Sequence, residues 1–207
     1  RQMCIRDSFW FEFKKVIPKG YTRLFGKLAE LTDSGIKIYF FVGNHDSWMM
    51  SYFKDELGID IFFKPKKFQI NSKKFFIGHG DGLGPGDYGY KFLKIIFRNP
   101  LFKFLYSCIH PDISIRIGEF LSRKNSVISG KEIKFESNEK ELLYNFCKKI
   151  LKSDHYHYFV FGHRHIPLKI NLGNNSLYYN CGDWFNHYSY LDFSNSELTL
   201  KFFKPEI

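Results

Sequence analysis

The sequence predicts a mixed α/β fold that contains two sheets. Three short apolar runs typical of buried strands occur before residue 162, and helical patterns lie between them. Four short strand-like segments follow His165, separated by turns rich in Gly, Asn and Ser. Strands and helices followed by such a meander are typical of an α/β sandwich of two sheets.

Length and composition indicate one domain. A chain of 207 residues with 44% hydrophobic residues can bury one sizeable core, and no segment resembles an interdomain linker. We therefore expect a single domain over residues 9–207. Residues 1–8 show neither a strand pattern nor a start signal, and we expect them to be non-native sequence, with the domain's N-terminal strands missing.

Apolar runs and cysteines indicate the compartment. No apolar run reaches the roughly 20 residues of a membrane-spanning helix, and no signal peptide opens the chain, so we expect a soluble, cytoplasmic protein. The cysteines at 4, 108, 147 and 181 form no C-x-x-C pair, which favours reduced thiols.

Three apolar runs end in the same way. They are 37–42 (KIYFFV), 74–77 (KFFI) and 158–161 (YFVF), and their lack of polar alternation suits strands buried on both faces. Each is followed by a glycine and polar residues: GNHD at 43–46, GHGD at 78–81 and GHRH at 162–165. Glycine allows a sharp turn at such a point. One such histidine would most often be structural, but three similar motifs together indicate a site.

The carboxyl ends of these runs carry the candidate metal ligands. If the three strands lie side by side, their ends meet in one crevice, where open α/β sheets commonly bind ligands. The residues expected there are Asn44, His79, His163 and His165. On extended backbone, His163 and His165 would point the same way. Amide oxygens and imidazole nitrogens suit manganese, iron or zinc better than calcium.

The remaining elements are predicted by their local patterns. A helix is expected over 22–32, stopped by Asp33, Ser34 and Gly35, and another through 142–150, opened by a capping box of Asn138 and Glu141. Residues 88–126 are expected to be helical and amphipathic, a pattern that ordinary core helices explain equally well. The meander comprises strands over 168–171, 176–180, 189–193 and 197–203, which we expect to form the second sheet.

The motifs GNHD, GHGD and GHRH resemble those of the calcineurin-like metallophosphoesterases. Within that family, residues 9–193 are most similar to the branch of UDP-2,3-diacylglucosamine pyrophosphatases of lipid A biosynthesis. The closer signature comprises FWFE at 9–12, GHGDGLGPGDYGY at 78–90, and Arg123, Asn125 and Ser126. The resemblance implies an αββα two-sheet sandwich with a helical lid insertion over 88–152.

The resemblance also implies a site with two divalent metal ions, taken as Mn²⁺. The implied metal ligands are Asn44, His79, His163 and His165. We expect His45 to stabilise the developing phosphoryl charge or protonate the leaving group, with Asp46 holding its ring; a loop cap is the alternative role for Asp46. The expected substrate-binding residues are Asn44, His45, Asp87, Tyr90, Arg123, Asn125, Ser126 and His163, with Lys131 as a further candidate.

The sequence also departs from the family pattern. The family has an Asp-x-His on its first strand and a Gly-Asp pair on its second, and this chain has neither. His165 would therefore lack most partners for its metal ion. We expect these 207 residues to be inactive by themselves.

The implied reaction is hydrolysis of the pyrophosphate bond of UDP-2,3-diacylglucosamine, which gives 2,3-diacylglucosamine 1-phosphate (lipid X) and UMP. The implied partners are this lipid-linked nucleotide sugar and the inner-membrane surface, where the protein would be peripheral. The net charge of +10 favours an anionic partner, although the codon bias of an AT-rich genome explains it equally well. The alternatives are another phosphodiesterase or nuclease of this fold, and a metal-poor scaffold without activity. No nucleic acid is expected, because the insertion is rich in apolar residues.

Overall fold

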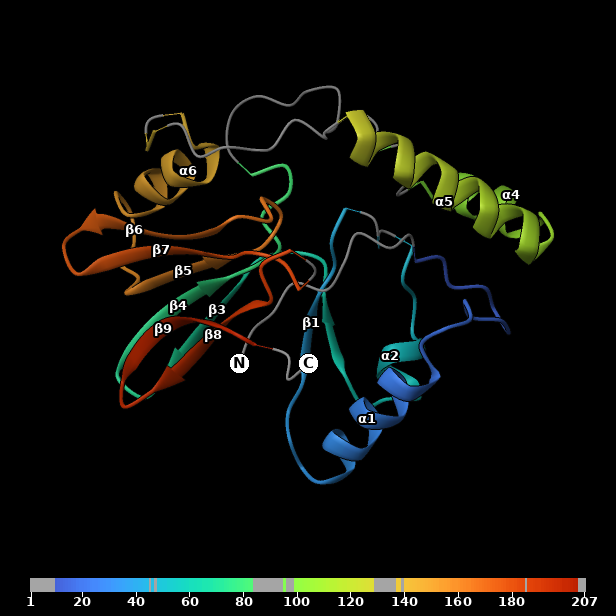
Figure 1. Ribbon diagram of the computed structural model, residues 1–207, viewed down its shortest axis with the longest axis horizontal. Helices are drawn as coiled ribbons and strands as arrows, with labels where there is room; N and C mark the ends of the chain where they lie inside the picture. Colours follow the sequence, from blue (N-terminus) through green and yellow to red (C-terminus); the bar gives the residue numbers. More distant parts are fainter. Residues whose placement is uncertain are drawn as a thin grey trace. The chain divides into compact units, whose positions relative to one another are not determined.

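The computed structural model describes residues 10–44, 46, 48–83, 95, 99–128, 137–138, 140–184 and 186–204, with backbone alone at 119 and 121–128. These residues form two compact units (Figure 1). Unit 1 takes its described residues from 64–86 and 131–207, and unit 2 from 7–63 and 87–130. Both units contain helices and strands, so the predicted mixed α/β class with several sheets is confirmed.

Unit 1 is built on a five-stranded sheet with the order β3-β4-β5-β7-β6. Its central strands β4, β5 and β7 run parallel, and β3 and β6 pair antiparallel at the two edges. The bounds are Lys66–Ile70 for β3, Lys73–Ile77 for β4, Tyr158–Phe161 for β5, Pro167–Gly173 for β6 and Ser176–Cys181 for β7. The predicted strands at 74–77 and 158–161 are confirmed as neighbours.

Both faces of this sheet are covered. Along β5, Phe159 and Phe161 pack into one cluster with helix α6, Leu142–Ile150. Tyr158 and Val160 face the opposite side, where they pack against the hairpin of β8, Ser189–Ser194, and β9, Glu197–Phe202. Side chains alternate along a strand, so an uninterrupted apolar run such as β5 requires a layer on each side. Figure 1 shows α6 and the hairpin as these layers.

The prediction that all four C-terminal strands form a second sheet is only half right. Strands β8 and β9 do pair in a separate two-stranded sheet. Strands β6 and β7 instead extend the first sheet, because β7 pairs parallel with β5 from Tyr158↔Leu177 to Phe161↔Asn180. Strand β7 is almost entirely buried, which suits a place inside a covered sheet rather than in a meander.

The predicted capping box at the start of α6 is wrong. Glu141 is itself the residue before the helix, in an extended conformation, and its side chain caps no backbone group. Asn138 contributes its carbonyl oxygen, which accepts from the Glu141 N–H at 3.2 Å. The Glu141 carboxylate is turned instead towards Arg164.

Unit 2 contains the predicted helix at 22–32, observed as α1, Thr22–Asp33, with Ser34 after its last turn. It also holds α2, Tyr52–Asp55, α4, Pro100–Ser107, and α5, Pro111–Ile128. Strand β1, Tyr39–Phe41, pairs parallel with β2, Asp60–Phe62, in a two-stranded sheet. The condition that this strand shares a sheet with β4 and β5 is not met among the described residues, where β1 pairs with β2 alone.

Glu12 anchors the segment that follows the GNHD motif. Its buried carboxylate accepts hydrogen bonds from the backbone N–H groups of Met50, Ser51 and Tyr52, each at 2.8 Å. These donors open α2, where N–H groups lack partners within the helix. The interaction holds the segment that contains Trp10 against the main hydrophobic core of unit 2.

Asp154 joins the loop before β5 to the edge of the sheet. Its carboxylate accepts a hydrogen bond from the Tyr156 hydroxyl at 2.7 Å and lies 3.2 Å from Lys67 Nζ and 3.6 Å from Lys74 Nζ. The hydrogen bond from Tyr156, followed by that from Lys67, lowers the pKa of Asp154 to about 2. The carboxylate is therefore stabilised in its charged form.

Asp154→Asn is expected to lower the melting temperature at pH 7. Because the folded-state pKa lies below the ordinary value of 3.8, this stabilisation is present above pH 3.8 and is lost as the pH falls towards 2. Melting curves of both proteins between pH 7 and pH 2 should therefore converge at the acid end. A difference that stays constant over this range would contradict the assignment.

Candidate functional site

The parallel pairing of β4 and β5 brings two of the predicted ligands together. The register runs from Phe75↔Tyr158 to Ile77↔Val160, and the Gly78 N–H donates to the Val160 oxygen at 3.1 Å just beyond it. His79 and His163 follow, and their ring centroids lie 5.2 Å apart with the planes at 67°. The expectation that the carboxyl ends of these strands meet is confirmed for this pair.

Gly80 allows the two turns to approach closely. Its φ is +111°, a conformation that residues with side chains rarely adopt. A Cβ atom at this position would lie 3.2 Å from a Leu143 methyl group and 3.4 Å from the His163 Cβ. The second glycine of the GHGD motif is therefore required by the packing of α6 and His163 around it.

The GHRH turn does not have the predicted extended backbone. Strand β5 ends at Phe161, and both His163 and His165 are left-handed, with φ of 55° and 56°. The Gly162 oxygen accepts from the Arg164 N–H at 2.6 Å and from the Asn180 side-chain amide. A left-handed conformation costs a residue with a side chain about 1–2 kcal/mol, so these contacts must hold the turn.

A buried carboxylate faces His165. Asp183 lies in the loop after β7, and its Oδ2 is 4.0 Å from His165 Nδ1 while its Oδ1 is 3.5 Å from His187 Nδ1. The same carboxylate accepts from the backbone N–H groups of Asn186 at 2.7 Å and His187 at 3.1 Å. Held in this way, the Asp183 carboxylate faces the Nδ1 side of the His165 ring at a distance that allows a charge interaction and is too long for a direct hydrogen bond.

Sequence reasoning missed Asp183, although a signal for it exists. Gly182 and Asp183 follow β7 directly, which repeats the pattern of a buried strand, a glycine and a polar residue. The prediction placed this strand in a second sheet, so its end was not assigned to the site.

The other predicted ligand, Asn44, belongs to unit 2, where it follows β1. Its place beside the histidines stays a prediction. His45 lies outside the described residues. Asp46 lies in the turn after β1, where its N–H donates to the Gly43 oxygen at 3.3 Å and its carbonyl accepts from the Met49 N–H at 3.1 Å.

The remaining substrate-binding predictions are not tested. Asp87, Tyr90 and Lys131 lie outside the described residues. Arg123, Asn125 and Ser126 fall within α5, of which the structure describes only the backbone at these positions.

The described residues fit part of a metal site. His79 and His163 supply two imidazoles at a spacing that can approach one cation, and imidazole suits manganese, iron and zinc. Within the described ranges, no three His, Cys, Asp or Glu side chains are grouped so that they could hold a metal ion. The four-ligand set and the two Mn²⁺ ions stay predictions.

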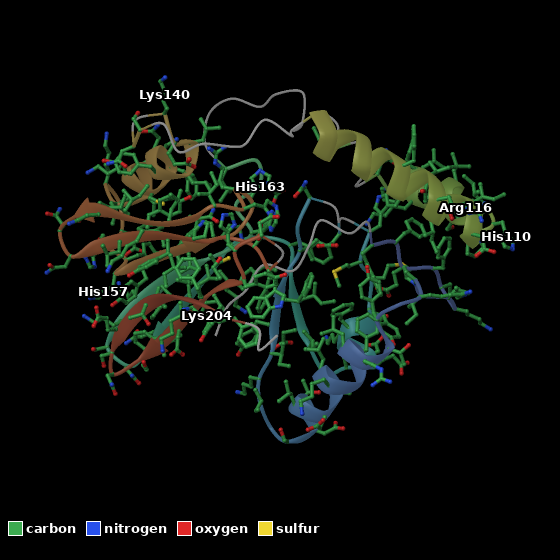
Figure 2. The ribbon with its side chains drawn as sticks, viewed as in Figure 1. His110, Arg116, Lys140, His157, His163 and Lys204 are labelled. Atoms are coloured by element: carbon green, nitrogen blue, oxygen red, sulfur yellow. The ribbon has the colours of Figure 1, made fainter. Side chains whose placement is uncertain are left out.

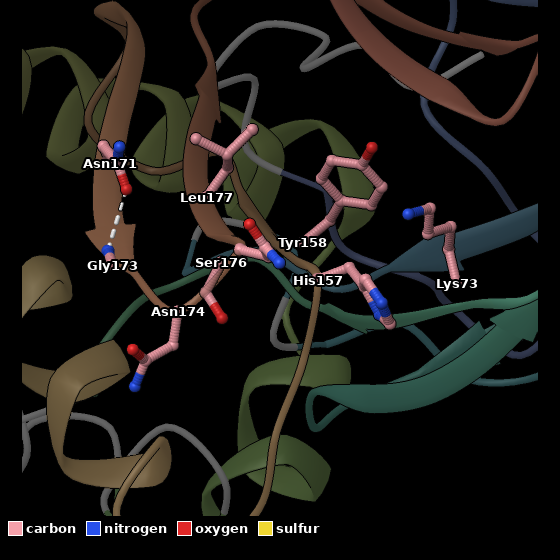
Figure 3. A pocket seen from close by; sticks show the side chains of 9 residues that line it. Lys73, His157, Tyr158, Asn171, Gly173, Asn174, Ser176 and Leu177 are labelled. Atoms are coloured by element: carbon pink, nitrogen blue, oxygen red, sulfur yellow. Dashed lines mark hydrogen bonds between the residues drawn. The ribbon is translucent and has the colours of Figure 1, made fainter.

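A polar depression of about 630 Å³ lies at the opposite end of the same sheet. Figure 2 shows His157 and His163 at these two ends, before and after β5. Figure 3 shows Lys73 and His157 on one side of the depression and Asn174 on the other. Burial, with the nearby charge of Lys73, lowers the pKa of His157, whose Nδ1 accepts from the Lys74 N–H at 3.1 Å. This depression is separate from the candidate site.

Comparison with known proteins identifies relatives over most of the chain. The UDP-2,3-diacylglucosamine hydrolase of Porphyromonas gingivalis is 32% identical over 94% of this chain and 79% of its own length. The protein of the same name from Pseudomonas syringae is 29% identical over 76% of this chain and 63% of its own length. The one from Ectopseudomonas mendocina is 40% identical over 37% of this chain and 31% of its own length. No protein-family profile matches the chain.

All of these relatives are named as hydrolases. The chain, with its mixed α/β fold and paired histidines, therefore belongs to the hydrolytic enzymes. The chain belongs to the UDP-2,3-diacylglucosamine hydrolase family. The resemblance predicted from GNHD, GHGD and GHRH is confirmed. The chain spans 79% of the Porphyromonas relative and less than two thirds of the Pseudomonas relative.

Asp183→Asn is expected to change the tautomer of His165. The negative charge of the carboxylate, 4.0 Å from Nδ1, favours a proton on that nitrogen, and a neutral amide removes this preference. Nitrogen-15 NMR of the histidine rings in the metal-free protein measures this directly. The rings of His155 and His157 at the far end of the sheet serve as internal controls, and an unchanged His165 spectrum would argue against the assigned contact.

Proposed function

We propose that the protein hydrolyses the pyrophosphate bond of UDP-2,3-diacylglucosamine and releases UMP and 2,3-diacylglucosamine 1-phosphate. The observation that carries the proposal is the 32% identity to a UDP-2,3-diacylglucosamine hydrolase over 94% of this chain. The proximity of His79 and His163 supports it, because it provides two metal-competent side chains at the carboxyl ends of adjacent parallel strands.

In this proposal Asn44, His79 and His163 hold one cation and His165 holds a second. Two divalent ions, which we take to be Mn²⁺, would polarise a phosphoryl oxygen, supply hydroxide at neutral pH and stabilise the leaving oxygen. The buried carboxylate of Asp183 orients the His165 ring. His45 stabilises the charge on the phosphoryl group, or protonates the leaving group, and Asp46 holds the His45 ring.

The apolar surface of unit 2 supports a lipid substrate. Helix α4 exposes Leu101, Phe104 and Leu105 by 65%, 63% and 57%, which is unusual for large apolar side chains on one short helix. We infer that α4 and α5 form a lid that receives the acyl chains, near the surface of the inner membrane. None of the described helices is long and apolar enough to cross a membrane.

A non-catalytic scaffold is the second candidate. The described residues hold no grouped set of three His, Cys, Asp or Glu ligands, and the sequence lacks the Asp-x-His and the Gly-Asp pair that the family carries on its first two strands. A nuclease is less well supported, because exposed apolar side chains on α4 do not suit a polyanion.

The proposal predicts Mn²⁺-dependent release of UMP by the protein translated from the complete reading frame that encodes these residues. His79→Ala is expected to lower kcat/KM by more than about 100-fold, the upper range for residues that only support metal ligands. Chelation of the metal should abolish activity, and added Mn²⁺ should restore it. UMP is measured by chromatography with UDP-2,3-diacylglucosamine as the substrate.

His157→Ala is the matched control, because it removes the same side chain at the opposite end of β5 and should leave the rate unchanged. If the unsubstituted protein releases no UMP above the His79→Ala protein, the proposal is excluded, and absence of release from both proteins would favour the scaffold.

A further inference from the structure

Glu141 is a buried carboxylate behind the GHRH turn. Its side chain is 2% exposed, and its Oε2 lies 3.2 Å from the Nε of Arg164. Among the described residues neither its Oε1 nor the Nε of Arg164 has a hydrogen-bond partner, so the 3.2 Å contact is an ion pair without hydrogen-bond geometry. Burying a charged group costs free energy unless the group is paired. The ion pair with Arg164 therefore stabilises the buried position of the Glu141 carboxylate.

The surroundings of Glu141 contain other buried polar groups. Burial raises the pKa of Tyr178 well above its ordinary value, and the negative charge of Glu141 raises it further. Burial likewise raises the pKa of the Cys147 thiol, again with a contribution from Glu141. These neighbours do not offset the charge of Glu141, which leaves Arg164 as its partner of opposite charge.

Arg164 stands between the two predicted ligands of the GHRH turn. Both flanking residues, His163 and His165, have left-handed backbones, which the turn must hold against their intrinsic preference. The Arg164 backbone is held by its bond to the Gly162 oxygen, and its side chain is held by Glu141. Glu141 in turn precedes α6, which packs on the sheet through Leu143 and Cys147.

We propose that the ion pair between Glu141 and Arg164 positions His163 and His165 by fixing the left-handed turn to the start of α6. Both are positioning residues that touch no reacting atom. The inference rests on the proposed function where it concerns metal affinity, but the backbone conformation it explains is independent of any metal. It assigns a role to the arginine of GHRH and to a glutamate 23 positions before it in the sequence.

The competing explanation is that Glu141 only stabilises α6, because a negative charge is favourable at a helix start. The two explanations differ in what Arg164→Ala does. A helix-start role predicts that the turn keeps its conformation and its cation affinity. A positioning role predicts that both change while the sheet stays folded.

The test uses the 207-residue chain with Arg164→Ala, Glu141→Gln and the conservative Arg164→Lys. Asp154→Asn is the matched control, because it removes an exposed ion-paired carboxylate from the same unit. In the metal-free proteins, the NMR contact between amide and Hα protons within His163 and within His165 is measured, which is strong only at positive φ. Calorimetry with Mn²⁺ alone then gives the affinity.

The expected result is a weakened intraresidue contact at both histidines and a Kd for Mn²⁺ raised at least about 10-fold in Arg164→Ala, as for other residues that orient metal ligands. Glu141→Gln should act in the same direction, and Arg164→Lys should retain most of the affinity. Asp154→Asn should change neither quantity. Unchanged contacts and an affinity within about twofold in Arg164→Ala would overturn the proposal.

Two further outcomes are also decisive. If Arg164→Ala fails to fold, the double variant Glu141→Leu with Arg164→Leu replaces the pair by apolar groups and should restore folding. It should still show the weakened contacts, and native contacts in it would refute positioning. If the unsubstituted chain binds no Mn²⁺, the proposed metal site fails for this chain, while the proton contacts alone still decide whether the pair fixes the turn.

Discussion

The parallel pairing of β4 with β5 is the interaction on which the candidate site depends. Three residue pairs, from Phe75↔Tyr158 to Ile77↔Val160, set the register that places His79 beside His163. The register is held because β5 is buried on both faces, by α6 on one side and the β8–β9 hairpin on the other. A slip by one residue would turn each aromatic side chain to the wrong layer. The hydrophobic core therefore sets the geometry of the polar residues at its end.

The sequence predicted the strands well and their partners less well. Apolar runs located β4 and β5 to within one residue, because strands in a covered sheet leave a plain pattern, and the stop signal at 33–35 located the end of helix α1. The same pattern does not say which strand lies next to which. That is why β7 was expected in a second sheet, and β1 in the first, whereas pairing is decided by contacts distant in sequence. The structure describes helices within the predicted insertion, while the lid itself stays a proposal.

The candidate site was predicted in part for a similar reason. The repeated strand, glycine and polar pattern identified His79 and His163, because it depends only on local sequence. Asp183 was missed because its strand was assigned elsewhere, and Glu141 was assigned to a capping box because its contact with Arg164, distant in sequence, leaves no local signal. The left-handed turn at GHRH could not be foreseen, since histidine has no strong preference for positive φ. Membership of the hydrolase family agrees with the local motifs, because these motifs do not depend on the order of the strands.

The proposed function depends on cation binding at the carboxyl ends of β4 and β5. Because Mn²⁺ is paramagnetic, it broadens the NMR signals of nearby protons, and a titration of the labelled chain locates the ion without any assay of activity. The signals of His79, His163 and His165 are expected to broaden first, while those of His155 and His157 at the opposite end of the sheet persist. Broadening centred on His155 and His157, or uniform broadening, would contradict it.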